Sequence, residues 1–152
     1  MITTAAREDI RESRPAKMAA ARKNPKILLV DDEVCFTDML KLNLELETDY
    51  KVFVENDSTQ ATRTAERTSP DIILLDAIMP GLDGFEVLCH LETDPLTRHI
   101  PVVFLTAISN VLSFPVSELS EIVERQTVSK PVSLADLVEV IESNLDQQKL
   151  RQ

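Results

Sequence analysis

Several short apolar runs in this sequence end in a residue that can take part in chemistry. Two adjacent carboxylates, Asp31 and Asp32, follow the first run, and a third carboxylate, Asp76, follows another. Thr106 and Lys130 stand at the same position after two later segments. A purely structural turn would more often place Gly, Asn or Ser there. These residues are therefore candidates for one functional site.

The charges of this set predict a divalent cation. Three carboxylates held close together repel one another, so a compensating cation is expected, and Mg²⁺ suits a site of oxygen ligands that keeps several waters. Lys130 can neutralise a carboxylate or an incoming phosphoryl oxygen, and Thr106 offers a hydrogen-bond donor. One carboxylate can attack phosphorus while the metal and the ammonium hold the developing negative charge. The set thus fits phosphoryl transfer.

The segments that position these residues are predicted strands. The strongest are residues 27–30, 72–75 and 102–105, and two weaker candidates are residues 52–54 and 127–129. Runs that are apolar on both faces are typical of a parallel sheet covered by helices. In such a sheet, ligands bind at the carboxyl ends of the strands, beside the point where the strand order reverses. We therefore expect the candidate side chains to meet at one rim.

Helices are predicted between the strands. The helix after the first strand is expected to place the following residues on one side: Phe36, Met39, Leu40, Asn43 and Leu46.

Four more helices complete the predicted set. One covers about residues 58–68, and the next is capped by Asp83 with Glu86. A fourth is expected to begin near Pro115, and Ser133 caps the last. Five strands alternating with five helices predict a three-layer α/β domain with right-handed crossovers.

Composition and charge limit the function classes. The net charge is −10, but residues 1–26 carry +4, so the remainder carries −14. An acidic body argues against direct nucleic-acid binding. Neither a membrane span nor a secretory leader is expected, and the two cysteines do not suggest a disulfide framework, so a cytoplasmic protein is predicted.

Four motifs resemble those of a known family. They are Val-Asp-Asp-Glu at 30–33, Leu-Leu-Asp-Ala-Ile-Met-Pro-Gly-Leu-Asp-Gly at 74–84, Leu-Thr-Ala at 105–107 and Ser-Lys-Pro at 129–131. Together they resemble the CheY-like receiver domain of bacterial two-component response regulators. The resemblance implies a doubly wound five-stranded parallel sheet with flanking helices and the flavodoxin-like strand order 2-1-3-4-5.

The expected domain boundaries follow from this resemblance and from the composition of the ends. The receiver domain is expected over residues 26–146. Residues 1–25 are expected to form a flexible basic tail, and residues 147–152 a short C-terminal tail. No second domain is expected after the last helix.

The resemblance also implies a role for each matching residue. Asp76 would accept the phosphoryl group, and Asp31 and Asp32 would hold Mg²⁺ together with Asp76 and the backbone carbonyl of Ile78. Thr106 would hydrogen-bond the phosphoryl group, and Lys130 would form an ion pair with it. The residues expected to shape the adjoining loops are Pro80, Gly84 and Pro131, the last preceded by a cis peptide bond.

The implied partners are a sensor histidine kinase or a histidine phosphotransfer protein, and a downstream protein whose identity is unknown. A homodimer stays open. The chain would be a phosphoacceptor that assists its own magnesium-dependent phosphorylation and dephosphorylation, and not an enzyme in the usual sense. Ile78 and Ile108 would flank the path of an attacking water, which favours slow self-dephosphorylation.

One departure from the family pattern affects signalling, and other classes of protein compete. Thr127 stands where many receivers have a Tyr or Phe switch, so the usual signal path is not expected. A pseudo-receiver, a docking module independent of phosphorylation, stays open as the alternative. A haloacid-dehalogenase-like phosphatase needs a second Asp two residues after the nucleophile, where this chain has Ile78. A nucleotide or flavin fold needs a Gly-rich phosphate loop, and this chain has two glycines.

Overall fold

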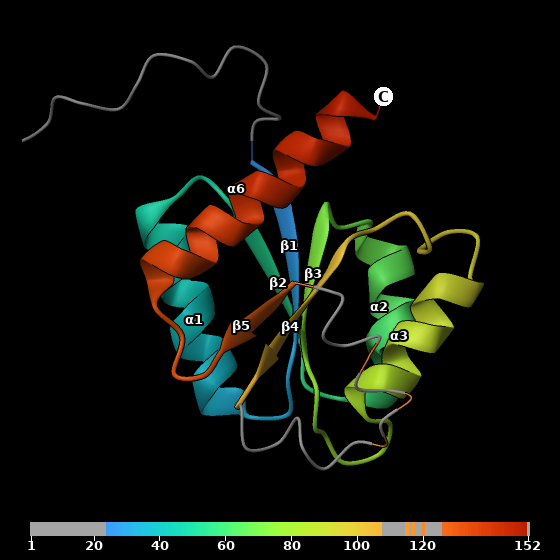
Figure 1. Ribbon diagram of the computed structural model, residues 1–152. Helices are drawn as coiled ribbons and strands as arrows, with labels where there is room; N and C mark the ends of the chain where they lie inside the picture. The colour runs from blue at the N-terminus through green and yellow to red at the C-terminus, as the bar shows by residue number, and fades with distance from the viewer. Residues whose placement is uncertain (1–23, 108–114, 116, 118–119, 121–125, 152) are drawn as a thin grey trace, which may run out of the picture.

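The computed structural model describes residues 24–107, 115, 117, 120 and 126–151. The strands are β1 (Lys26–Val30), β2 (Lys51–Glu55), β3 (Ile72–Asp76), β4 (Val102–Thr106) and β5 (Thr127–Ser129). The helices are α1 (Val34–Glu47), α2 (Ala61–Thr68), α3 (Gly84–Thr93) and α6 (Leu134–Leu150), with a short 3₁₀ helix, η1 (Ser58–Gln60), before α2. Figure 1 shows their arrangement.

The strands form one parallel sheet in the order β2-β1-β3-β4-β5. The predicted doubly wound, flavodoxin-like fold is therefore confirmed. After β1 the chain winds outward to β2, and then returns past β1 to β3. The strand order thus reverses between β1 and β3, and this is where a ligand site is expected at the carboxyl ends of the strands.

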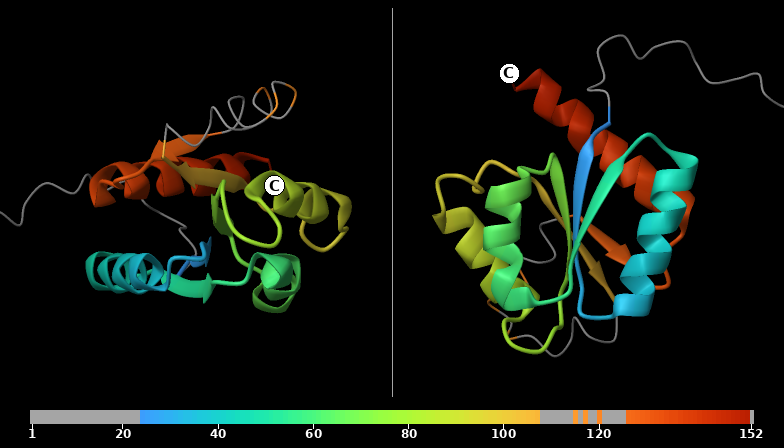
Figure 2. Two further views of the ribbon diagram at one scale, coloured as in Figure 1. Left: turned by 90° about the horizontal axis from the view of Figure 1, so that it is seen from below. Right: turned by 180° about the vertical axis from the view of Figure 1, so that it is seen from behind.

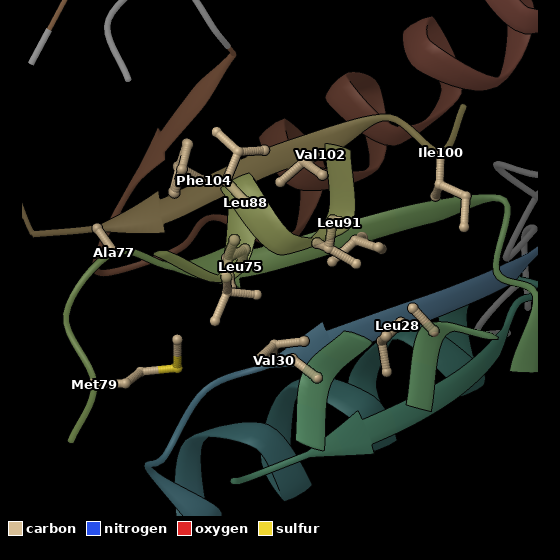
Figure 3. Close-up of a cluster of buried hydrophobic side chains, with 14 residues drawn as sticks. Leu28, Val30, Leu75, Ala77, Met79, Leu88, Leu91, Ile100, Val102 and Phe104 are labelled. Atoms are coloured by element: carbon tan, nitrogen blue, oxygen red, sulfur yellow. The ribbon is translucent and has the colours of Figure 1, made fainter. Parts of the chain in front are cut away.

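The sheet separates two hydrophobic cores. On β1, Leu28 and Val30 face the core beneath α2 and α3, whereas Ile27 and Leu29 face the core beneath α1 and α6. Figure 2 shows the two helix pairs on opposite sides of the sheet, and Figure 3 shows the core beneath α2 and α3. Because successive side chains point to opposite faces, strands buried on both sides must be apolar throughout.

The predicted inner face of α1 is partly wrong. The buried residues of α1 are Thr37, Leu40 and Leu44, while Met39 and Leu46 are 54% and 71% exposed. The helix has apolar residues on two sides, so periodicity alone cannot choose the side that packs. Thr37 is tolerated inside because its hydroxyl donates to the Val34 carbonyl and accepts from the Asn56 side chain.

Local capping signals were more reliable. Asp83 Oδ1 accepts from the Glu86 amide, and Glu86 Oε2 accepts from the Asp83 amide, so the predicted capping box opens α3. Ser133 Oγ accepts from the Asp136 amide at the start of α6. This last helix continues to Leu150, past the predicted domain boundary at residue 146.

The fourth helix expected near Pro115 falls largely outside the described residues. In the part of the chain that the structure describes, no helix is long and apolar enough to cross a membrane.

Candidate functional site

Three carboxylates meet at the rim where the strand order reverses. Asp31 and Asp32 follow β1, and Asp76 is the last residue of β3. Each can place one oxygen so that all three oxygens lie within 4.8 Å of one another. Asp31 is fully buried and Asp76 nearly so, whereas Asp32 is half-buried. The pairing of β1 with β3 brings these residues together from distant positions in the sequence.

Lys130 reaches this cluster from the loop after β5. Its Nζ donates to Asp31 Oδ2 at 2.6 Å and lies 3.7 Å from Asp76 Oδ1. It also lies 3.6 Å from Glu33 Oε1 and 4.5 Å from the centre of the Phe36 ring. The ammonium is therefore held between carboxylates on one side and an aromatic face on the other.

The backbone around Lys130 fixes its approach. The Lys130 amide donates to the Thr106 carbonyl at 3.0 Å, which ties the end of β5 to the end of β4. The peptide bond between Lys130 and Pro131 is cis, as the resemblance implied. Thr106 itself is buried, and its hydroxyl donates a long, 3.3 Å hydrogen bond to the neighbouring Ala107 carbonyl.

The environment of Asp76 raises the pKa of its carboxyl to about 6 from 3.8. Burial is the largest cause, and the negative charge of Asp31 adds to it. The Lys130 ammonium and a hydrogen bond from the Ile78 amide act in the opposite direction but do not cancel the effect. Asp76 thus carries a charge that its surroundings compensate only in part.

Burial opposes the charge on Lys130, but its partners outweigh burial. The hydrogen bond to Asp31 and the charges of Asp76, Asp31 and Glu33 raise the pKa of the Lys130 ammonium above its ordinary value. Lys130 therefore stays cationic at neutral pH and is available to an anion that enters the site.

The residues present fit Mg²⁺. Asp31, Asp32 and Asp76 supply hard oxygen donors within one coordination sphere. Among the described residues, the Lys130 ammonium pairs with Asp31 and Asp76 of this cluster, and burial together with the negative charge of Asp31 still raises the pKa of Asp76. A divalent cation would relieve this repulsion.

Gly84 is required by a close backbone approach. A Cβ added there would lie 2.4 Å from the Asp76 carbonyl oxygen and 2.8 Å from Ala77 Cα. The Gly84 amide donates to the Ala77 carbonyl at 2.8 Å and closes the loop that follows β3. The loop also carries Ile78, which is 38% exposed, and the exposed Pro80. Gly84 therefore lets the start of α3 pack directly against the end of β3.

Sequence reasoning missed three residues near the site. Glu33 and Phe36 contact the Lys130 ammonium, and the Asn56 side chain donates to the Asp31 carbonyl at 2.7 Å. Asn56 follows β2, so the rule that polar residues mark the carboxyl ends of strands could have found it. From the sequence, Phe36 was placed only on a helix face, because its position in the sequence does not reveal its contact with the Lys130 ammonium.

The structure describes some of the other residues that the sequence analysis singled out, but not all of them. Thr127 lies on β5 and is exposed. Ile108, expected to flank the site opposite Ile78, lies outside the described residues. His90, His99 and Cys35 are all exposed.

Replacing Asp76 with Asn should stabilise the metal-free protein at neutral pH. The raised pKa corresponds to a penalty of about 3 kcal/mol when Asp76 is ionised, and the variant should recover about 1–3 kcal/mol of it. The penalty is full above the folded-state pKa of about 6 and vanishes as the pH falls toward 3.8, so the difference should shrink with decreasing pH.

Urea unfolding in the presence of EDTA measures this difference. Asp49→Asn, an exposed aspartate just beyond α1, is the matched control and should change stability little. An Asp76→Asn protein no more stable than wild type at neutral pH would contradict the expected cost of ionising the buried Asp76 carboxyl.

Comparisons with known proteins agree with this arrangement. The family described as "Response regulator receiver domain" matches residues 27–142. The response regulator PleD of Caulobacter vibrioides is 48% identical over 83 residues, which are 55% of this chain and 18% of PleD. The alkaline phosphatase synthesis transcriptional regulatory protein PhoP of Bacillus subtilis is 42% identical over 84 residues, 55% of this chain and 34% of PhoP.

The aligned part of this chain thus spans only 18% and 34% of these two curated relatives. Among solved structures, the receiver domain of the Francisella response regulator 1452 has a TM-score of 0.68 and 25% identity, with 82% of this chain and 99% of that one covered. The family model matches most of the length of this chain, and the fold agrees with it. The chain therefore belongs to the response regulator receiver domain family.

Proposed function

We propose that this chain accepts a phosphoryl group on Asp76 from a phosphohistidine of a sensor kinase or phosphotransfer protein, and then signals through protein contacts. The observation that carries the proposal is the buried Asp76 carboxylate, flanked by Asp31, Asp32 and the Lys130 ammonium. The cation and the hydroxyl that a phosphoryl group needs are available at the same rim.

The transfer is a displacement at phosphorus. An oxygen of the ionised Asp76 carboxylate forms a bond to phosphorus while the bond from phosphorus to the histidine nitrogen breaks, and the imidazole keeps that electron pair. Lys130, which already lies 3.7 Å from Asp76 Oδ1, pairs with a phosphoryl oxygen. Thr106 donates its hydroxyl hydrogen to another. Asp31, Asp32, Asp76 and the Ile78 carbonyl would hold Mg²⁺, which would supply further positive charge near the phosphoryl oxygens.

The alternative is a pseudo-receiver that docks partners without phosphorylation. A docking module has no need to bury an acidic cluster that raises the pKa of Asp76, because buried like charges reduce stability. The retained cluster therefore favours phosphorylation over docking alone.

Incubation with acetyl phosphate and Mg²⁺ should add one phosphoryl group to the protein, detectable by intact mass. Asp76→Asn should abolish the addition because no nucleophilic carboxylate remains at that position, and EDTA should suppress it. Asp49→Asn, at an exposed aspartate just beyond α1 and outside the cluster, is the control and should be labelled like wild type. Undiminished labelling of Asp76→Asn would refute the assignment, and an unlabelled wild type would favour the pseudo-receiver.

The surface of α1 supports a helical phosphodonor. Cys35, Met39, Leu42 and Leu46 are exposed and recur at intervals of four, three and four residues, which places them along one side of the helix. This stripe lies opposite the buried side of α1 and begins next to the acidic rim. A protein that presents phosphohistidine to Asp76 must cover this rim, and an apolar stripe with that spacing suits packing against a partner helix.

Met39→Gln and Leu42→Gln should each slow phosphorylation by the cognate phosphodonor about fivefold or more, because they remove apolar contact area from the stripe. Labelling by acetyl phosphate, which needs no docking, should stay unchanged. Leu96→Gln alters a leucine of similar exposure after α3 and serves as the control. Equal rates for all variants with the phosphodonor protein would exclude the stripe as its docking surface.

The phosphorylated state should be long-lived. Water must approach phosphorus in line, past the side chain of Ile78, which is partly exposed at the rim and cannot orient a water. Ile78→Asn should hasten the decay of phospho-Asp76 about threefold or more, a barrier change of at least roughly 0.65 kcal/mol, and Ile108→Glu should act in the same direction. Decay in Mg²⁺ at neutral pH, followed by intact mass, measures this. Polar variants that decay no faster than wild type would contradict the role of the isoleucines.

A further inference from the structure

The hydroxyl of Ser58 bridges two backbone groups of another loop. Ser58 Oγ donates to the Pro80 carbonyl and accepts from the Leu82 amide, both at 2.9 Å. Ser58 belongs to η1 and is only 2% exposed. Its two partners stand on either side of Gly81, which has φ of +85°. One buried hydroxyl thus holds the tip of the loop between β3 and α3.

Gly81 leaves room for this bridge. A Cβ at position 81 would lie 3.1 Å from Ser58 Oγ and 3.3 Å from Thr59 Cγ2. The positive φ also favours glycine at this position. The turn and the hydroxyl therefore fit each other closely.

Ser58 is itself firmly placed. Asp57 caps η1 by accepting from the Thr59 amide at 3.0 Å. The preceding Asn56 donates to the Asp31 carbonyl at 2.7 Å and to Thr37 Oγ1 at 3.0 Å. The segment from Asn56 to Ser58 consequently connects the loop after β1 with the loop after β3.

These two loops adjoin all of the oxygens expected to hold Mg²⁺. Asp31 and Asp32 follow β1, and Asp76 and Ile78 stand at the end of β3 and just beyond it. The base of the second loop is closed by the Gly84 amide on the Ala77 carbonyl, and Ser58 fastens its tip. A shift of the tip would therefore move Ile78 relative to the aspartates.

We propose that Ser58 is a positioning residue for the magnesium site: by bridging the Pro80 carbonyl and the Leu82 amide, its hydroxyl holds the loop that carries the Ile78 carbonyl. Groups that orient metal ligands commonly change metal affinity by tenfold or more when removed. The inference rests on the magnesium site of the proposed function, but the hydrogen bonds can be tested without the metal.

The test compares Ser58→Ala and Ser58→Cys with wild type. Cysteine fills nearly the same space but is a weak donor and acceptor, so both variants lose the bridge while only alanine loses volume. Calorimetric titration should give an Mg²⁺ affinity about tenfold weaker for both. In metal-free protein, amide hydrogen exchange at Leu82 should be at least about tenfold faster, because its acceptor is lost.

Thr97→Val provides the matched control. Thr97 is 1% exposed, and its hydroxyl donates to the Leu91 carbonyl at 2.7 Å in the connection after α3, away from the rim. This variant loses one buried hydroxyl but should keep wild-type Mg²⁺ affinity and wild-type exchange at Leu82. A matching loss of Mg²⁺ affinity in Thr97→Val would assign the effect to general destabilisation and overturn the proposal.

Three further outcomes decide between this inference and the proposed function. If wild type binds Mg²⁺ and both Ser58 variants bind it equally well, the role of Ser58 is refuted while the magnesium site stands. If only Ser58→Cys keeps the wild-type Mg²⁺ affinity, Ser58 acts through packing, and the proposed role of its hydroxyl is refuted. If wild type binds no Mg²⁺, both the site and the role of Ser58 are wrong.

Discussion

Repulsion among three carboxylates at one rim is the constraint on which the rest of this structure depends. Asp31 and Asp76 are buried beside Asp32, and the Lys130 ammonium lies within 4 Å of an oxygen of each of the two buried carboxylates. Lys130 does not cancel the effect of burial and of the neighbouring Asp31 charge, which together raise the pKa of Asp76. Keeping an ionised Asp76 in this cluster costs stability at neutral pH, which we relate to the proposed binding of a divalent cation and a phosphoryl group.

Strand pairing and hydrogen bonds hold the three carboxylates close together. The parallel pairing of β1 with β3 sets the two acidic strand ends side by side. Gly84 permits α3 to start against the Asp76 carbonyl, and the Lys130 amide binds the end of β4. Asn56 and Ser58 fasten the two acidic loops to the end of β2. Hydrogen bonds from neighbouring elements thus fix groups that would otherwise move apart.

The outer side of α1 is exposed and begins next to the acidic rim. Its inner side packs through Leu40 and Leu44, while Met39 and Leu42 remain exposed above the sheet. Phe36, near the start of the same helix, lies under the Lys130 ammonium. Because α1 starts directly after the acidic pair, a protein that packs near the start of this helix would lie next to the acidic rim. In the proposed function, the exposed side of α1 and the acidic rim would form one surface for the phosphodonor.

Much of this protein was determined by the sequence alone. Doubly apolar runs ending in Asp31, Asp76 and Thr106 predicted the parallel sheet and its reactive rim, since burial on both faces leaves such strands no polar side. The capping box of Asp83 and Glu86 was also predictable from the sequence, because it depends on two residues that are three positions apart. Only the tertiary structure decided which side of α1 packs, since that helix is apolar on two sides. It alone also brought Phe36, Asn56 and Ser58 into the site. Their contacts join residues distant in sequence, and the distances and burial that make them useful exist only once the sheet has assembled.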